Sequence, residues 1–384
     1  MRGSGFDTWA GEKVNADSAM KIATVYACVK IISEGLAKLP FHILQRDRKD
    51  PRKSGLPNTT AGMEIYDLLH YEPNHWQTSY EFREQIIGHA SLRGNGYAFA
   101  NKVRGRVREL LPLHPDSVHP RLDPKWIVVY EITNTDGSTE ERTKDEVFHV
   151  KGFGTDQLVG YSPIEFHRQT LGESVAQQRH SANLWGNRAK PGGLLTHPSK
   201  LSKEAGERLQ EQMDAKVNGE NSGKTLILEE AMDWKQIGLT SVDAQFIETR
   251  KLTRSDIAVI WGVKPHLIGD LDRAIQSNIE EQSRSHVVDT LLPWIIRFEE
   301  ATRRDLLKGV SRDLFAKLSV EGLLRGSSKD RSEFYRTMLE LGVYTRNEVR
   351  DREDLNPLPG LDEPLTPLNL TQGNEDANSE EPDQ

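Results

Sequence analysis

Cysteine is almost missing from this sequence, because Cys28 is the only one among 384 residues. A single thiol excludes a disulfide within the chain and a cage of thiolate metal ligands. Long hydrophobic runs are also missing: none approaches the roughly 18 apolar residues that a membrane span needs. The N-terminal stretch MRGSGFDTWAGEK lacks the apolar core of a secretory signal. We therefore expect a soluble chain made in a reducing cytoplasm, with no membrane partner.

The sequence also lacks an excess of positive charge. Its formal net charge is −8, and residues 371–384 contribute five acidic side chains and no base. A site-specific DNA-binding protein usually concentrates lysine and arginine on one face, and no such concentration is visible here. The segment 369–384 is too polar to pack, so we expect it to be a disordered acidic tail.

Motifs for catalysis and metal binding are incomplete. GENSGKT, residues 219–225, resembles a phosphate-binding loop, but three residues separate its glycines where the motif has four. GESVA, residues 172–176, approaches a nucleophile elbow, but Ala176 replaces the second glycine and the segment lies in a predicted helix. The twelve histidines are scattered and form no HExxH motif. We therefore expect that the protein is not an enzyme and binds no cofactor. We also expect no catalytic, cofactor-binding or metal-ligating residue.

Local signals mark helix starts along the chain. In a capping box, a serine or threonine and a glutamate three residues later satisfy two backbone amides of the first helical turn. Four such pairs are present: Thr78/Glu81, Ser162/Glu165, Ser277/Glu280 and Thr345/Glu348. Together with hydrophobic periodicity they predict helices over 18–37, 79–92, 163–188, 203–217, 243–261, about 30 residues from Asn278, 329–341 and 346–354. Pro293 is expected to kink the longest of these helices.

Strand patterns concentrate in the first 160 residues. They predict a strand at 40–45, a hairpin turning at Gly105, a second hairpin turning at Asp136-Gly137, and a strand at 145–151. Within residues 189–241, the segments KTLILEE and MDWKQIGL are expected to pair as another hairpin. That module is too small for a large core of its own, and it lies between the two long helices predicted at 163–188 and 243–261. The fold class is therefore α+β.

Seven segments in this order resemble those of portal proteins of long-tailed bacteriophages. They are TVYACVKIISEGLAKLPFHI; LRGNGYAFA with RELLPLHPDSVHP; GYSPIEF; WGNRAKPGGLL; GVKPHLIGD; SNIEEQ with TLLPWIIRFEEA; and GVYTRNEVRDREDLNPLPG. The resemblance covers nearly the whole chain. It implies the portal fold, with an α/β wing, a long-helix stem, a small α/β clip and a helical crown.

The resemblance also implies domain boundaries. The expected parts are the wing at 1–160, the first stem helix at 161–188, the clip at 189–241, the second stem helix at 242–262, the tunnel loop and long wing helix at 263–325, the crown helices at 326–368, and the acidic tail at 369–384.

A portal is implied to be a ring, commonly a dodecamer, at one vertex of the capsid. Double-stranded DNA is packaged and ejected through its channel. The implied partners are copies of itself, DNA bound transiently and without sequence preference, the terminase large subunit, a head-tail adaptor, and the major capsid and scaffold proteins. The implied location is the virion, with assembly in the host cytoplasm. The alternative is a monomeric adaptor or scaffold protein of the phage head.

Two sets of residues are candidates for contact with DNA and with neighbouring subunits. The resemblance places a DNA-tunnel loop at Gly269, Asp270, Asp272, Arg273, Ile275, Gln276 and Ser277. A single arginine beside two aspartates attracts phosphate only weakly, which suits a channel that must let DNA slide. For the stem helices we expect inter-subunit contacts from Arg168, Arg179, Trp185, Arg188 and Arg250.

Overall fold

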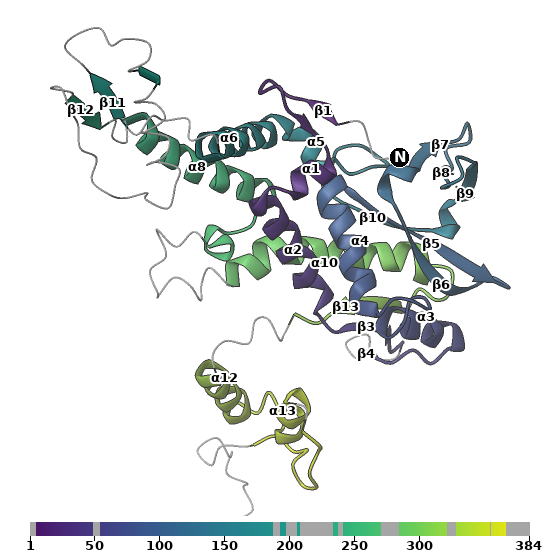
Figure 1. Cartoon of the computed structure of the whole chain (residues 1–384). Helices are drawn as coiled ribbons and strands as arrows, with labels where there is room; N and C mark the ends of the chain where they lie inside the picture. Colours follow the sequence, from purple (N-terminus) through teal and green to yellow (C-terminus); the bar gives the residue numbers. More distant parts are fainter. Residues whose placement is uncertain are drawn as a thin grey trace, which may run out of the picture.

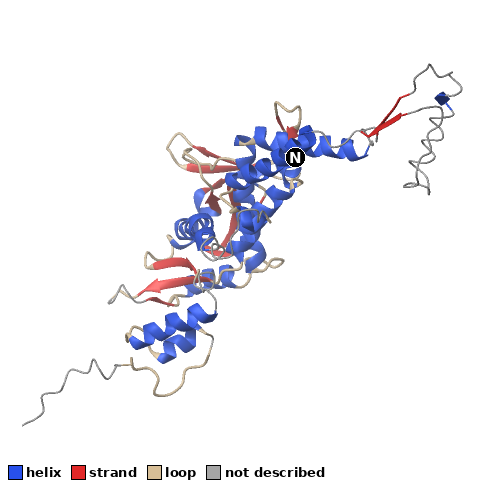
Figure 2. Cartoon of the chain, turned by 90° about the vertical axis from the view of Figure 1, so that its left-hand side faces the viewer, coloured by secondary structure: helices blue, strands red, loops and turns tan. Residues whose placement is uncertain are grey.

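The protein has an α/β body from which helices extend at two ends (Figures 1 and 2). The computed structural model describes residues 5–48, 54–186, 193–196, 206–207, 233–236, 241–269, 284–320, 328–353 and 355–365. Its described strands form five antiparallel sheets, with the orders β1-β2, β10-β5-β6, β11-β12, β13-β3-β4 and β7-β8-β9. The first 151 residues therefore supply most of the strands, as the sequence predicts.

The N-terminal helical segment is broken where one helix was expected. The structure has α1 (Ala16–Met20), whose cap Asn15 accepts a hydrogen bond from Ser18, and α2 (Ala23–Ala37). Residues 21 and 22 separate the two helices, so the prediction of one continuous helix over 18–37 was wrong. Along α2, Val25 and Ile32 are buried, but Tyr26 is 51% exposed. Tyr26 lies one residue, or about 100°, away from the buried stripe.

Helix α4 (Ser79–Arg93) follows the sequence expectation closely. The side chains of Thr78 and Glu81 form the reciprocal capping box, and Gly94 ends the helix with a left-handed backbone at φ +80°. Its apolar face is fully buried at Phe82, Ile86 and Ile87. This face packs on α2 and on the central sheet, so the helix connects two layers of the body.

The central sheet consists of β5 (Asn95–Val103), β6 (Arg106–Leu113) and β10 (Val147–Lys151). The predicted turn at Gly105 joins β5 to β6, and both outer strands pair antiparallel with β5. A separate sheet contains β7 (Val118–Leu122), β8 (Val128–Thr133) and β9 (Thr139–Thr143). The hairpin predicted at Asp136-Gly137 is the β8–β9 pair, and residues around His119 pair with β8 on its other side. The structure has the edge strand β7 there, where Pro120 costs no ladder bond.

The third body sheet joins distant parts of the chain. Strand β13 (Leu314–Leu318) pairs with β3 (Phe41–Arg46), and β3 pairs with β4 (Ser54–Gly55). Helix α3 (Thr60–His70) packs on β3. The short helices η1 (Pro115–Ser117) and η2 (Lys144–Glu146) connect strands. Ala316 lies opposite Ile43, so the C-terminal half of the chain completes the N-terminal body.

A long helix runs through the body as three consecutive segments. They are the π-helical η4 (His286–Leu291), α10 (Leu292–Thr302) and the π-helical η5 (Arg303–Leu307). A kink was expected at Pro293, and the helix there is irregular because the π-helical η4 directly precedes α10. In α10, Phe298 is fully buried. Its ring lies edge-on to Phe41 at 5.7 Å and to Phe148 at 5.6 Å between centroids, so α10 connects two sheets.

Two further helices extend from the body and lie side by side in Figure 1. The predicted helix 163–188 is divided at His167 into α5 (Pro163–Phe166) and α6 (Arg168–Gly186). Helix α8 (Ser241–Ile260) packs along α6. Beyond them, β11 (Gly193–Thr196) pairs with β12 (Asp233–Gln236). The predicted strand MDWKQIGL thus has a described partner in AKPGGLLTHP, whereas KTLILEE and most of 203–217 lie outside the described residues.

The C-terminal helices are α12 (Ser328–Glu340) and α13 (Arg346–Arg352), close to the predicted bounds. Gly342 lies between them at φ +66°, and Thr345 and Glu348 form the expected capping box. Tyr335 donates a hydrogen bond to Glu353 across the pair at 3.0 Å. Figure 2 shows this pair and the β11–β12 hairpin at opposite ends of the molecule. The predicted disordered tail lies outside the described residues.

Candidate functional site

The paired helices α6 and α8 share buried small and hydroxyl side chains. Gln177 of α6 donates a hydrogen bond to Thr253 Oγ1 of α8 at 3.2 Å, and Thr253 donates to the backbone oxygen of Thr249. Ser174 and Ser181 are also buried in α6. Small buried side chains allow two helices to approach closely, so the pair forms a narrow rod.

The arginines expected to bridge subunits are placed differently from one another. Arg168 donates to the backbone oxygen of Glu165 at 3.1 Å. Arg179 forms an ion pair with Glu12 of the same chain at 2.6 Å. Trp185 lies in α6 and Arg250 in α8, without described side chains, and Arg188 lies outside the described residues. The structure therefore brings Arg179 to an N-terminal partner that the sequence did not suggest.

The turn after α8 is tightly fixed to the body. Gly262 has φ +65°, and its backbone oxygen accepts a hydrogen bond from Thr290 at 2.6 Å. The indole N–H of Trp261 donates to the backbone oxygen of Ser91 at 2.9 Å, which pairs the polar atom of this buried ring. Pro265 opens the short helix η3 (Pro265–Ile268). Backbone geometry and side chains thus fix where the following segment begins.

Charged groups reinforce this turn from the long helix. Lys264 Nζ lies 3.2 Å from Asp289 Oδ2, and Ser285 Oγ donates to the same oxygen at 2.5 Å. These two contacts, the serine first, lower the pKa of Asp289 below its usual value. Nearby, burial lowers the pKa of His286 to about 4. His286 is therefore neutral at physiological pH.

Of the expected tunnel-loop residues, the structure describes Gly269 alone. Gly269 ends η3 with a left-handed backbone at φ +81°, as a glycine at this position allows. Asp270, Asp272, Arg273, Ile275, Gln276 and Ser277 lie outside the described residues. The prediction of a loop between 269 and 277 therefore stays a prediction.

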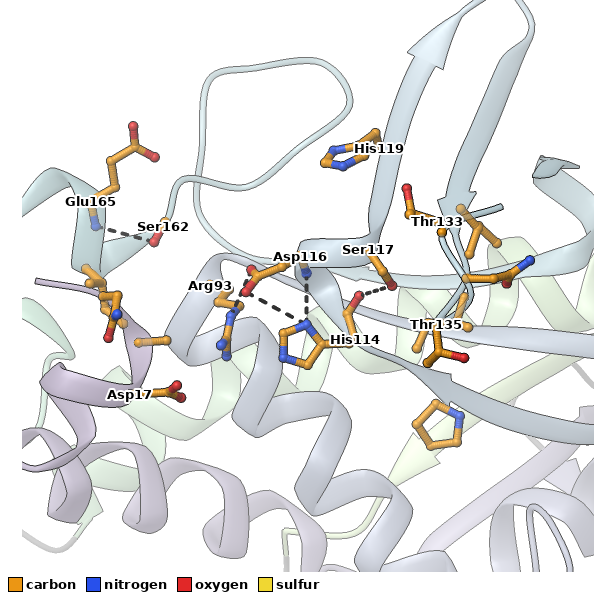
Figure 3. Close-up of a pocket in the computed structure, with 18 of the residues that line it drawn as sticks. Asp17, Arg93, His114, Asp116, Ser117, His119, Thr133, Thr135, Ser162 and Glu165 are labelled. Atoms are coloured by element: carbon orange, nitrogen blue, oxygen red, sulfur yellow. Dashed lines mark hydrogen bonds and ion pairs between the residues drawn. The ribbon is translucent and has the colours of Figure 1, made fainter. Parts of the chain in front are cut away.

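A cavity beside the β7–β8–β9 sheet and the start of α5 has a volume of about 1100 Å³. Figure 3 shows its polar side chains. Arg93 Nε donates to Asp116 Oδ1 at 3.0 Å, and Ser117 Oγ donates to the backbone oxygen of His114 at 2.7 Å. Ser162 Oγ accepts from the backbone N–H of Glu165, as a helix cap does. Both hydroxyls thus make hydrogen bonds that stabilise a turn and a helix cap.

Two other residues that could have had a chemical role lie within helices. Cys28 is fully buried in α2, and burial raises the pKa of its thiol to about 12. Ser174 of the GESVA segment lies within α6. Among the described side chains, no group of three His, Cys, Asp or Glu residues is arranged to hold a metal ion. Within the described ranges, no helix has both the length and the apolar character needed to cross a bilayer. The GENSGKT segment lies outside the described residues.

A family model described as phage portal protein matches residues 23–354. The chain belongs to the phage portal protein family. This portal chain is 35% identical to the portal protein of Enterobacteria phage HK97, over 91% of its own length and 82% of that protein. It is 29% identical to the probable portal protein of Streptomyces phage phiC31, over 96% of its own length and 82% of that protein.

Solved structures agree with this family. A chain in the virion of a native gene transfer agent particle matches with a TM-score of 0.67 and 26% identity, over 93% of the portal chain and 97% of that chain. The neck of the native particle, computed with C12 symmetry, matches with a TM-score of 0.66 and 26% identity over the same shares. An HK97-family portal protein from Corynebacterium diphtheriae, at 16% identity and a TM-score of 0.52, over 84% of the portal chain and 98% of that chain, supports the fold.

Sequence analysis missed the N-terminal hairpin that packs on α6. Strands β1 (Phe6–Asp7) and β2 (Lys13–Val14) have two residues each, too few for a visible alternation. The one local signal was Gly172 inside a predicted helix. A Cβ on Gly172 would lie 2.5 Å from Thr8 Oγ1, so this glycine makes room for the hairpin.

Proposed function

We propose that this chain assembles with identical copies into a ring-shaped portal at one capsid vertex, through which double-stranded DNA is packaged and ejected. The observation that carries the proposal is the α6–α8 rod, which projects from an α/β body within a family match over residues 23–354. Related neck structures have C6 and C12 symmetry. A ring of twelve subunits satisfies both symmetries, so twelve is the number we propose.

The parts of the chain then have geometric roles. The body forms the wing, α6 and α8 form the stem, residues 189–241 form the clip, and α12 and α13 form the crown. Residues 269–277 form the tunnel loop, which begins at the fixed turn after Gly262. The clip is the docking surface for the terminase large subunit and later for a head-tail adaptor. The wing and crown meet the major capsid and scaffold proteins, during assembly in the host cytoplasm.

The chain performs this work without catalysis, and the energy for packaging comes from a separate motor. Its tunnel loop must touch DNA only weakly, because each tight phosphate contact adds salt-dependent affinity and slows sliding. With Arg273 next to Asp270 and Asp272 in sequence, the loop carries little net positive charge.

Imaging tests the proposal against the monomeric-adaptor alternative. Particles assembled in infected cells are disrupted gently, and the released assemblies are examined by negative stain and mass photometry. A ring with a central hole and about twelve copies of the 43.4 kDa chain is expected. Release of this chain only as a monomer, from particles that contain DNA, would overturn the portal role and favour the adaptor.

We further propose that Arg168, Arg188 and Arg250 pair with acidic groups of the next subunit, and that Arg179 acts through Glu12. Charge reversal at Arg168 or Arg250 is expected to lower the salt concentration at which rings dissociate, because exposed ion pairs are screened by salt. The control is Arg104→Glu, since Arg104 is exposed at the β5–β6 turn. Unchanged salt resistance in Arg168→Glu and Arg250→Glu would overturn this assignment.

A further inference from the structure

The N-terminal hairpin presents an exposed tryptophan on a fixed support. Its tip residue Trp9 is 91% exposed. The backbone N–H of Trp9 donates to Gln169 Oε1 at 2.8 Å, and Glu12 pairs with Arg179 at 2.6 Å. Thr8 fills the space over Gly172. The hairpin is thus held to α6 at three points, while its largest apolar side chain contacts little of its own subunit.

A second feature of the body is a hollow lined by aromatic rings. This aromatic pocket has a volume of about 440 Å³, and its lining includes Phe153, Tyr161, Phe166, Trp294 and Arg297. Phe153 is 72% exposed and Phe166 is 59% exposed. The ring centroids of Tyr161 and Phe166 lie 4.4 Å apart with the planes tilted by 33°, so the pocket has a wall of two aromatic rings in contact.

The aromatic pocket also contains an arginine next to one of its rings. The Arg297 guanidinium lies 5.8 Å from the ring centroid of Trp294. Arg297 and Phe153 also line an adjacent hollow that contains Lys151. An occupant that combines an aromatic ring with a carboxylate fits this arrangement, because the ring packs on the aromatic wall and the carboxylate meets arginine.

The N-terminal hairpin of another copy of this chain has both an aromatic ring and a carboxylate. Asp7 precedes the turn with its side chain 88% exposed, in a 4.0 Å contact with Lys13. Trp9 follows two residues later. Exposed apolar surface of this size in a family that forms rings is typical of a contact between subunits, where tryptophan and arginine are enriched.

The hairpin packs on a face of α6 that points away from α8. Gly172 faces the hairpin, whereas Gln177 contacts Thr253 of α8. Five residues at about 100° each place these two faces of α6 about 140° apart. The pocket lies where α5 and the end of α8 meet α10, because its lining includes Phe166, Trp261 and Trp294. A head-to-tail ring needs a protrusion and a hollow that are built from separate residues of each subunit.

We propose that Trp9 of one subunit inserts into the aromatic pocket of the next subunit, with Asp7 facing Arg297. This inference rests on the proposed ring and adds the contact that closes it. Each copy then supplies one protrusion and one hollow, so every contact around the ring is identical. The hairpin transmits this contact to the stem through Glu12 and Arg179.

The first test compares two exposed tryptophans. Trp9→Ala is expected to lower the population of complete rings by about tenfold or more at the protein concentration where the wild type is half assembled, as loss of an interface anchor does. Trp126→Ala is the matched control, because Trp126 is 77% exposed at the β7–β8 turn and outside the proposed contact. Mass photometry gives the ring population, and a thermal melt checks that both variants fold.

A charge swap tests the orientation of the contact. Asp7→Arg and Arg297→Asp are each expected to reduce ring formation, and the double variant is expected to restore it. A merely structural role of either residue would not produce such a rescue.

The outcomes separate this inference from the portal role. If wild-type rings form and Trp9→Ala assembles like Trp126→Ala, the docking of Trp9 is overturned and the portal proposal stands. Loss of adaptor or capsid attachment with intact rings would assign the pocket to another protein and also overturn the inference. If the wild type forms no ring within DNA-filled particles, the portal proposal fails and this contact fails with it.

Discussion

The loop that carries Phe153 depends on a close approach of three backbone segments. A Cβ added to Gly160 would lie 2.2 Å from the oxygen of Gly94 and 2.8 Å from the nitrogen of Gly152. Both atoms belong to the backbone, so a side-chain rotation cannot relieve the overlap. Gly160→Ala therefore has to move the loop away from the end of α4.

The cost follows from the hydrogen bonds that this movement breaks. Gly152 N–H donates to Gly94 O at 2.8 Å. Gly160 N–H donates to Asn95 Oδ1 at 2.8 Å, and Asn95 Nδ2 donates to Gly160 O at 3.1 Å. At about 1 kcal/mol for each buried hydrogen bond, losing all three destabilises the protein by about 3 kcal/mol.

Gly88 provides a matched control with the opposite expected sign. It lies within α4, and an added Cβ would meet nothing within 4 Å. Gly88→Ala is expected to stabilise the helix by about 0.5–1 kcal/mol, because alanine loses less backbone entropy than glycine. The same chemical change thus shifts the free energy of unfolding in opposite directions at the two positions.

Denaturant unfolding and hydrogen exchange measure the two effects. For Gly160→Ala we expect a lower unfolding midpoint and faster exchange of the amides at residues 152–161. For Gly88→Ala we expect a midpoint at or above that of the wild type. Equal midpoints for Gly160→Ala and wild type, with unchanged exchange in the loop, would refute the reasoning.

Two further predictions concern the body. Phe298→Ala removes the ring between Phe41 and Phe148, and calorimetry is expected to show a loss of about 3–5 kcal/mol; a loss below about 1 kcal/mol would contradict its central place in the core. Burial, with Arg304 and Lys151 nearby, lowers the pKa of His149 to about 3, so its neutral form stabilises the fold above about pH 6.5 and this stability is lost as the pH falls. Between pH 7 and pH 5 the wild type should lose about 2 kcal/mol more than His149→Gln, and parallel curves would contradict this.

Helix starts and hairpin turns were predictable because their causes are local. The capping boxes at Thr78 and Thr345 involve hydrogen bonds within four residues, and both form as expected. The turn at Gly105 has φ +76°, a geometry that glycine adopts readily. Sequence order over seven segments indicated the portal family, and the family match over residues 23–354 confirms it.

Breaks and pairings within the body were not predictable in the same way. No proline or glycine stands at His167 to mark the interruption, so hydrophobic periodicity predicted one continuous helix across this position. Strand β7 was not predicted; it contains Pro120, which a strand accommodates at the edge of a sheet. Such outcomes depend on neighbours that are distant in sequence.

The sequence by itself determined the α+β class, the main helices and turns, and the family to which the chain belongs. Tertiary structure alone decided that β13 pairs with β3 across more than 260 residues, that Arg179 pairs with Glu12, that Trp9 is exposed, and that an aromatic pocket forms beside Trp294. The physical reason is the separation along the sequence of the groups that interact. Caps and turns are set by bonds between near neighbours, whereas ion pairs, sheets and hollows require segments that only the folded chain brings together.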